Sequence, residues 1–145
     1  MTLENLRRIG KLRAHVAERA EIDRLLDSAD LRLRDASVPG LGADSRFGLA
    51  YDAILKAALA AMLASGYRPV TSEPGHHQTL IQALVKTAQW EPQAVVVLEA
   101  YRKLRNKSDY EGEPVGEAVA AACIGSARQL LDGVRRTIGG QRPRS

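Results

Sequence analysis

With 145 residues and a single cysteine, Cys123, the chain has the length of one ordinary domain and cannot form an internal disulfide. Hydrophobic residues make up 45% of it and aromatic residues only 4%, which favours closely packed helices over a β-sandwich. The net charge is +4, but the positive excess lies in residues 1–13 and from Arg135 onward. The rest of the chain is slightly acidic, which argues against general binding of duplex nucleic acid.

The lone cysteine suits a reducing compartment, so we expect a cytoplasmic protein. The longest apolar run, residues 57–64, is far shorter than the ~20 residues that a membrane span needs. We therefore expect no membrane contact.

Apolar residues recur at helical spacing from the N-terminus onward. One stripe runs through residues 3–16 and a second through residues 22–36. No strong helix breaker separates them after Gly10, so residues 1–37 are consistent with one bent helix or with two. Pro39 and the glycines around it end this region.

The clearest helix is expected over residues 44–65. Asp44 or Ser45 can cap its N-terminus, and Gly66 supplies the stop. A polar loop is expected over residues 67–75, before the next helix.

Three further segments show helical patterns. One follows residue 75, one begins at Pro92, and one runs from Pro114 to about Ile138. The predicted inward residues of the last two are Ala94, Val97, Leu98, Tyr101, Leu104, Val115, Val119, Ala122 and Leu130, and the small residues Ala118, Ala122, Gly125 and Ser126 suit close helix packing.

These patterns predict an all-α protein, a five- to six-helix up-down bundle. We expect residues 1–138 to form a single helical domain and residues 139–145, which carry two arginines, to form a flexible basic tail.

The most unusual stretch is residues 101–110. On a helix, Arg102, Arg105 and Asp109 fall within about 60° of one another, beside an apolar stripe. One interpretation is that the arginines pair with carboxylates at a helix junction, because an unpaired buried charge is costly. The other is that they line a cleft for an anionic partner, because guanidinium groups match phosphate well.

Three segments together resemble the core of bacterial HEPN proteins: RFGLAYDAILKAALAAMLASGYRP, GHHQTLIQAL and AYRKLRNKSDYEG. The resemblance covers roughly residues 44–137. It implies an HEPN-like helical bundle that dimerises. Many members of that superfamily are metal-independent endoribonucleases in toxin–antitoxin, CRISPR or other defence systems, often beside a nucleotidyltransferase partner.

Ribonuclease members carry an arginine, a polar residue after it, and a histidine four to six residues further on. Arg105 and Asn106 match the first two positions, but the histidine is missing and Tyr110 stands nearest to its place. The resemblance therefore implies Arg105, Asp109 and Tyr110 as catalytic candidates, with Asp109 as a base if it is desolvated. The alternative is a helix-end network in which Asp109 pairs with Arg105 and Tyr110 packs over the pair.

Binding of RNA or a nucleotide is predicted to involve Arg102, Arg105, Asn106, His76 and His77. The two histidines open a helix, where they either contact a facing helix or act catalytically across the fold, or else serve as loop and capping residues. No Cys or carboxylate set accompanies them, so no metal site is expected, and no cofactor motif is present.

The leading hypothesis is an HEPN-type protein of a prokaryotic toxin–antitoxin or defence-like system, which binds RNA or a nucleotide in a dimeric cleft and acts as a metal-independent endoribonuclease if it is catalytic. The alternative is a non-catalytic helical module that docks a partner such as a nucleotidyltransferase. A third is a structural homodimer in which Arg105 and Asp109 pair across the two-fold axis.

Overall fold

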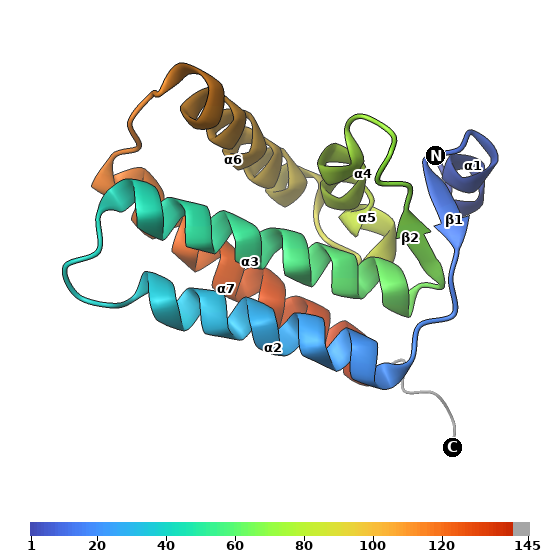
Figure 1. Ribbon diagram of the computed structural model, residues 1–145. Helices are drawn as coiled ribbons and strands as arrows, with labels where there is room; N and C mark the ends of the chain where they lie inside the picture. The colour runs from blue at the N-terminus through green and yellow to red at the C-terminus, as the bar shows by residue number, and fades with distance from the viewer. Residues whose placement is uncertain (141–145) are drawn as a thin grey trace.

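The computed structural model describes residues 1–140, which form seven helices and a two-stranded sheet. The fold is mostly helical, so the expected all-α class is confirmed at that level (Figure 1). In chain order the elements are α1 (Leu3–Arg8), β1 (Leu12–Ala14), α2 (Arg19–Ala36), α3 (Ala43–Ala64), β2 (Tyr67–Pro69), α4 (His76–Gln82), α5 (Leu84–Thr87), α6 (Pro92–Glu111) and α7 (Glu117–Gly140).

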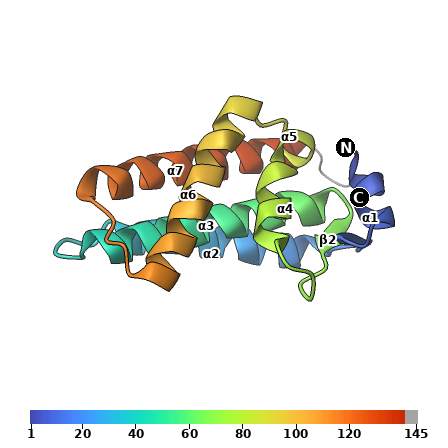
Figure 2. The same cartoon turned by 90° about the horizontal axis from the view of Figure 1, so that it is seen from above.

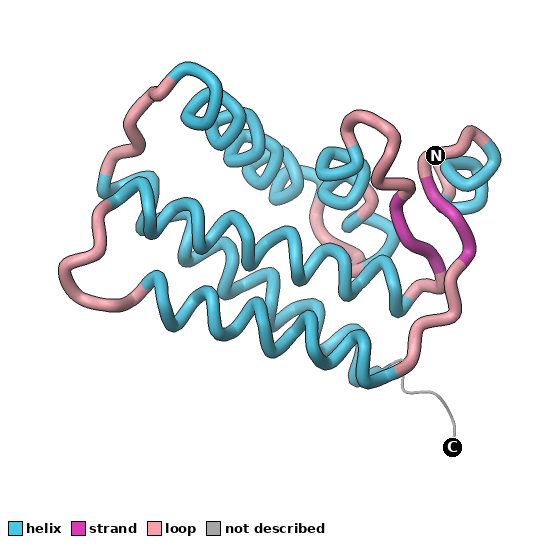
Figure 3. The backbone as a smooth tube through the Cα atoms, in the orientation of Figure 1, coloured by secondary structure: helices cyan, strands magenta, loops and turns pink. Residues whose placement is uncertain are grey.

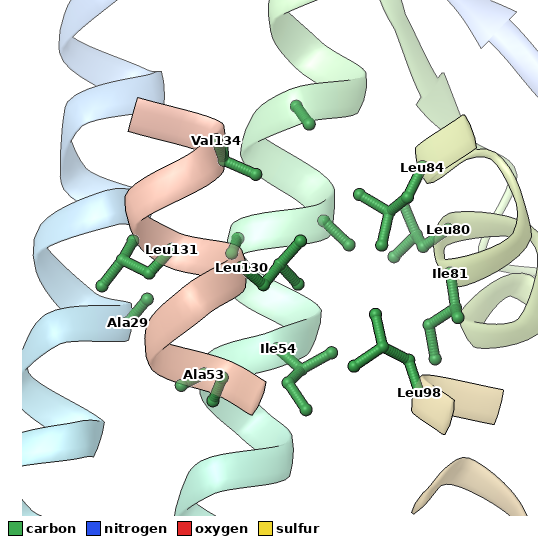
Figure 4. Packing of buried hydrophobic residues seen from close by; sticks show 14 of the residues in the cluster. Ala29, Ala53, Ile54, Leu80, Ile81, Leu84, Leu98, Leu130, Leu131 and Val134 are labelled. Carbon is green, nitrogen blue, oxygen red and sulfur yellow. The ribbon is translucent and has the colours of Figure 1, made fainter. Parts of the chain in front are cut away.

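Helices α2, α3 and α7 form one layer, with α3 in contact with both of the others (Figure 1). Their shared core contains Ala29 of α2, Ala53 of α3, and Leu130, Leu131 and Val134 of α7 (Figure 4). The alanines leave room for the leucines of the facing helix, so the three backbones approach closely.

A second layer, made of α4, α5 and α6, covers another side of α3. Viewed from above, α6 crosses over α3 rather than running alongside it (Figure 2). Leu80, Ile81 and Leu84 meet Leu98 of α6 above Ile54 of α3 (Figure 4). This crossing places the arginine-bearing half of α6 over the first half of α3.

The helical prediction for residues 3–16 is wrong beyond Arg8. Gly10 adopts a left-handed conformation (φ +82°) that turns the chain out of α1. Leu12–Ala14 then pairs antiparallel with Tyr67–Pro69, a segment expected to be loop (Figure 3). Leu12 is buried in this extended segment, whereas Val16, from the same predicted stripe, is almost fully exposed.

The helix boundaries differ in several places from those expected. Gly42, not Asp44 or Ser45, is the N-cap residue of α3. The segment after residue 75 divides into α4 and α5 at Ala83. Helix α7 begins at Glu117 instead of Pro114. The predicted stop at Gly66 (φ +94°) and Pro92 in the first turn of α6 are confirmed.

Some residues expected to face inward are exposed, namely Val97, Val119, Ala122 and the small residues Ala118 and Gly125. Val95 and Cys123 take the buried positions instead. α7 extends to Gly140, so Gly139 and Gly140 belong to that helix. The remainder of the predicted basic tail, 141–145, lies outside the described residues.

By length and composition alone, α3 is apolar enough to cross a membrane. Most of the window concerned is buried against neighbouring helices. The core helix of a globular protein has the same composition, so the finding is weak evidence for a span.

Candidate functional site

An open cleft of about 1040 Å³ lies where α6 crosses α3, and we call it the α3–α6 cleft. Its volume is at the upper end of the range typical of ligand pockets. Helix α3 supplies one wall, α6 the other, and His77 of α4 completes the lining. The lining residues used below are Asp44, Gly48, Tyr51, Asp52, His77, Arg105, Asn106, Asp109, Tyr110 and Glu113.

Arg105 lies directly over Gly48 of α3. A Cβ placed at Gly48 would be 2.5 Å from Nη1 of Arg105. The absence of a side chain at this position therefore creates the space that the guanidinium group occupies. Sequence reasoning missed Gly48, although a glycine inside a strongly helical segment is the signal that could have identified it.

Arg105 also pairs with Asp109, with 3.3 Å between Nε and the carboxylate. The predicted ion pair is thus present within one chain. Both side chains are about half exposed, so Asp109 does not meet the desolvation that its proposed role as a base requires.

Tyr110 does not pack over the ion pair as expected. It is 88% exposed in the last turn of α6, at the rim of the cleft. It follows Asp109 directly, and successive side chains on a helix point about 100° apart. Tyr110 is therefore a rim residue here.

His77 of α4 also lines the cleft. Its ring packs edge-on against Tyr51 and against His76, with centroid distances of 6.4 and 4.5 Å. His77 is still exposed, but partial desolvation of its ring lowers its pKa, and the neighbouring His76 and Arg102 lower it further while Asp52 acts in the opposite direction. His77 is consequently neutral at pH 7 and able to accept a proton.

Tyr51 supports His77 from α3 and is itself buried. Burial raises the pKa of Tyr51 to about 12, so its hydroxyl stays protonated at neutral pH. Phe47 and Tyr101 continue this aromatic cluster beneath the cleft, at 6.4 Å from Tyr51 and 6.2 Å from Phe47 respectively. Packing within this aromatic cluster holds Tyr51 in place, and the ring of His77 lies against Tyr51.

Arg102 lies outside the main cleft, in an adjoining hollow of about 150 Å³. It shares this side hollow with His76 and Gln78, and with His77 and Asn106, which also line the main cleft. Two bonds of 3.0 Å join Arg102 to Glu99, and they raise the pKa of the guanidinium group. The guanidinium group of Arg102 is therefore held in place by Glu99 of the same helix.

All of the predicted site residues thus line the main cleft or the adjoining side hollow. Four carboxylates of the described residues line the main cleft, and sequence reasoning missed three of them as site residues, namely Asp44, Asp52 and Glu113. Asp52 is paired with Arg32 (3.0 Å) and Lys56 (3.5 Å). The carboxylate of Asp44 accepts a bond of 2.7 Å from the backbone N–H of Val115.

No group of three or more His, Cys, Asp or Glu side chains suited to a metal ion occurs within residues 1–140. Comparison of the chain with protein-family models, with curated proteins and with solved structures gives no match. The HEPN resemblance therefore stays a prediction from the sequence.

Proposed function

We propose that the α3–α6 cleft binds the phosphate groups of RNA and cleaves the chain without a metal ion. The observation that supports this most directly is that Arg105 and Asn106 of α6 share one cleft with His77 of α4. A cation that stabilises phosphate charge and a neutral imidazole that accepts a proton are groups that promote phosphodiester cleavage by an internal hydroxyl, and an amide can donate hydrogen bonds to the phosphate.

Each group then has a defined task. His77 accepts the proton of a ribose 2′-hydroxyl while O2′ forms a bond to phosphorus and the bond to O5′ breaks. Arg105 stabilises the negative charge that develops on the phosphate oxygens, and Asn106 orients them. The leaving 5′-oxygen takes its proton from water.

Arg105 must exchange Asp109 for phosphate in this scheme. The pair is half exposed, lies one helical turn apart and has a separation of 3.3 Å, so it contributes only about 0–0.5 kcal/mol. A bidentate contact with phosphate is stronger than that. The ion pair therefore keeps the guanidinium group of Arg105 in the cleft and does not prevent phosphate from binding there.

We propose that His77 supplies the imidazole that the histidine of the R-x4-6-H pattern supplies in an HEPN ribonuclease. In keeping with that resemblance, we propose an HEPN-type bundle that dimerises and acts in a prokaryotic toxin–antitoxin or defence-like system. Arg105 and Asp109 already pair within one chain, so a dimer has no need to pair them across its two-fold axis.

The proposal is tested by incubating a mixed RNA pool with purified protein in excess EDTA. Binding is measured separately by fluorescence anisotropy with a 2′-O-methyl oligonucleotide, which lacks the nucleophile. Arg105→Ala should weaken binding and abolish cleavage, while His77→Asn should abolish cleavage and leave binding within a few-fold of the unmodified protein.

His15→Asn is the matched control. His15 bonds to Glu21 at 3.1 Å, away from both the cleft and the side hollow. This variant should bind and cleave normally. Unchanged RNA affinity in Arg105→Ala would show that the cleft is not the RNA site.

A second candidate function is a non-catalytic module that docks a protein partner, such as a nucleotidyltransferase. The carboxylates that line the cleft favour it, because Asp44 and Glu113 form no ion pair within residues 1–140. Such a cleft suits a basic protein surface. A partner that co-purifies stoichiometrically, together with absence of RNA binding, would support this function over the first.

A further inference from the structure

Two arginines face each other across the small sheet at the other end of α3. Arg13 of β1 and Arg68 of β2 are direct cross-strand partners. The neighbouring pair, Leu12 and Pro69, is buried. Because side chains alternate along a strand, Arg13 and Arg68 both project from the opposite, outer face.

The register of this pairing is fixed. The backbone N–H of His15 donates to the carbonyl of Gly66 at 2.9 Å, and that of Val70 donates to Lys11 at 3.0 Å. These bonds flank the strand pair on both sides. The two arginines therefore cannot slip past one another while the sheet is formed.

Like charges directly opposite each other in an antiparallel pair are destabilising. Neither arginine forms an ion pair with a carboxylate among residues 1–140. A two-stranded sheet of three residues per strand is itself marginal. The arrangement places two cations together with no counter-charge from the described part of the chain.

Both arginines line one hollow of about 150 Å³. The segment that follows β2 completes the lining, and it includes two hydroxyl-bearing residues, Thr71 and Ser72. Two guanidinium forks and two hydroxyls are donors suited to a tetrahedral oxyanion.

We propose that the hollow between Arg13 and Arg68 is a binding site for a phosphate group. The oxyanion would sit between the two forks and neutralise their repulsion. The group belongs either to a free phosphate-bearing small molecule or to the backbone of a polynucleotide. The site is separate from the α3–α6 cleft, which lies over the first half of α3, so it does not depend on the proposed function.

The test is a titration of isotopically labelled full-length protein with inorganic phosphate, followed by NMR of the arginine Nε–Hε signals. Sodium chloride at matched ionic strength is the baseline. The signals of Arg13 and Arg68 should shift together and saturate. The signal of Arg24, which is exposed on α2, should shift no more than it does in chloride.

Arg13→Gln and Arg68→Gln should each reduce the rise in Tm that phosphate produces beyond chloride by at least half, whereas Arg24→Gln should retain it. Equal shifts of all three signals in the unmodified protein, or no shift, would overturn the proposal whether or not the variants fold.

A second titration identifies the source of the phosphate. It uses a 2′-O-methyl oligonucleotide without terminal phosphates. Movement of the same two signals assigns the site to a polynucleotide backbone, whereas a response to inorganic phosphate alone assigns it to a small phosphate-bearing molecule. Arg105→Ala should leave the response of the Arg13 and Arg68 signals to inorganic phosphate unchanged, which separates this site from the cleft.

Discussion

Replacing Gly48 with alanine should stabilise the protein while it damages the cleft. The new Cβ would lie 2.5 Å from Nη1 of Arg105, closer than a real contact allows. The obstacle is the far end of a flexible side chain, so Arg105 can swing away without disturbing α3. Its guanidinium group would then leave the position in which it meets phosphate.

The change in the free energy of unfolding follows from two opposing effects. Alanine is favoured over glycine inside a helix by about 0.8–1.0 kcal/mol. Loss of the half-exposed pair between Arg105 and Asp109 removes about 0–0.5 kcal/mol. The free energy of unfolding should therefore rise by about 0.3–1 kcal/mol, which raises Tm by roughly 1–4 °C for a chain of this length.

RNA affinity should move in the opposite direction. A hydrogen bond to a charged group contributes about 1.5–3 kcal/mol, which corresponds to a loss of roughly 10- to 100-fold in affinity. Urea unfolding gives the stability, and anisotropy with the 2′-O-methyl oligonucleotide gives the affinity.

Gly125→Ala is the control. Gly125 lies inside α7, and a Cβ there would meet no atom of residues 1–140 within 4 Å. This variant should gain similar stability and keep full RNA affinity. If Gly48→Ala bound RNA as well as Gly125→Ala does, the position of Arg105 over Gly48 would have no role in binding.

Three further predictions concern the scaffold. Gly133→Ala would place its Cβ against the rigid ring of Trp90, so unfolding in urea should show a loss of about 1–3 kcal/mol; unchanged stability would refute this packing. Burial raises the pKa of Cys123 to about 12, so a thiol reagent at pH 8 should label it only when the protein unfolds, and rapid labelling of the native state would contradict the burial. The hydrogen bond from Arg128 lowers the pKa of Asp30, so Asp30→Asn should lower the free energy of unfolding by about 0.5–1 kcal/mol at pH 7. The difference between the two proteins should shrink as pH falls below ~4, because the unmodified protein then loses the same contribution. An equal difference at pH 7 and pH 2.5 would rule this out.

The long helices could be predicted from the sequence because their signals are local. Apolar spacing and the left-handed Gly66 define α3 to within one residue at each end. The small sheet could not be predicted in the same way, because Leu12 and Pro69 are 57 positions apart and pair only once α3 has brought their strands together. Three residues per strand are too few to show a clear alternation.

The candidate site was partly predictable for the same reason. Arg105 and Asp109 are one helical turn apart, so their pairing follows from helix geometry. The presence of His77 and Arg105 in one cleft depends on how α4 and α6 pack over α3, which no local pattern specifies. The space above Gly48 is likewise a property of two crossing helices.

The most direct test of the central claim is the pH dependence of RNA cleavage in EDTA by unmodified protein, His77→Asn and His15→Asn. Because the pKa of His77 is lowered below its usual ~6.5, more of the imidazole is neutral as pH rises, and kcat/KM should increase through a pKa below that value and then level off. His15→Asn should show the same profile, and His77→Asn should lose roughly 100-fold or more together with the ascending limb. No cleavage in EDTA by folded protein, or an unchanged profile in His77→Asn, would contradict the claim that His77 and Arg105 form a ribonuclease site.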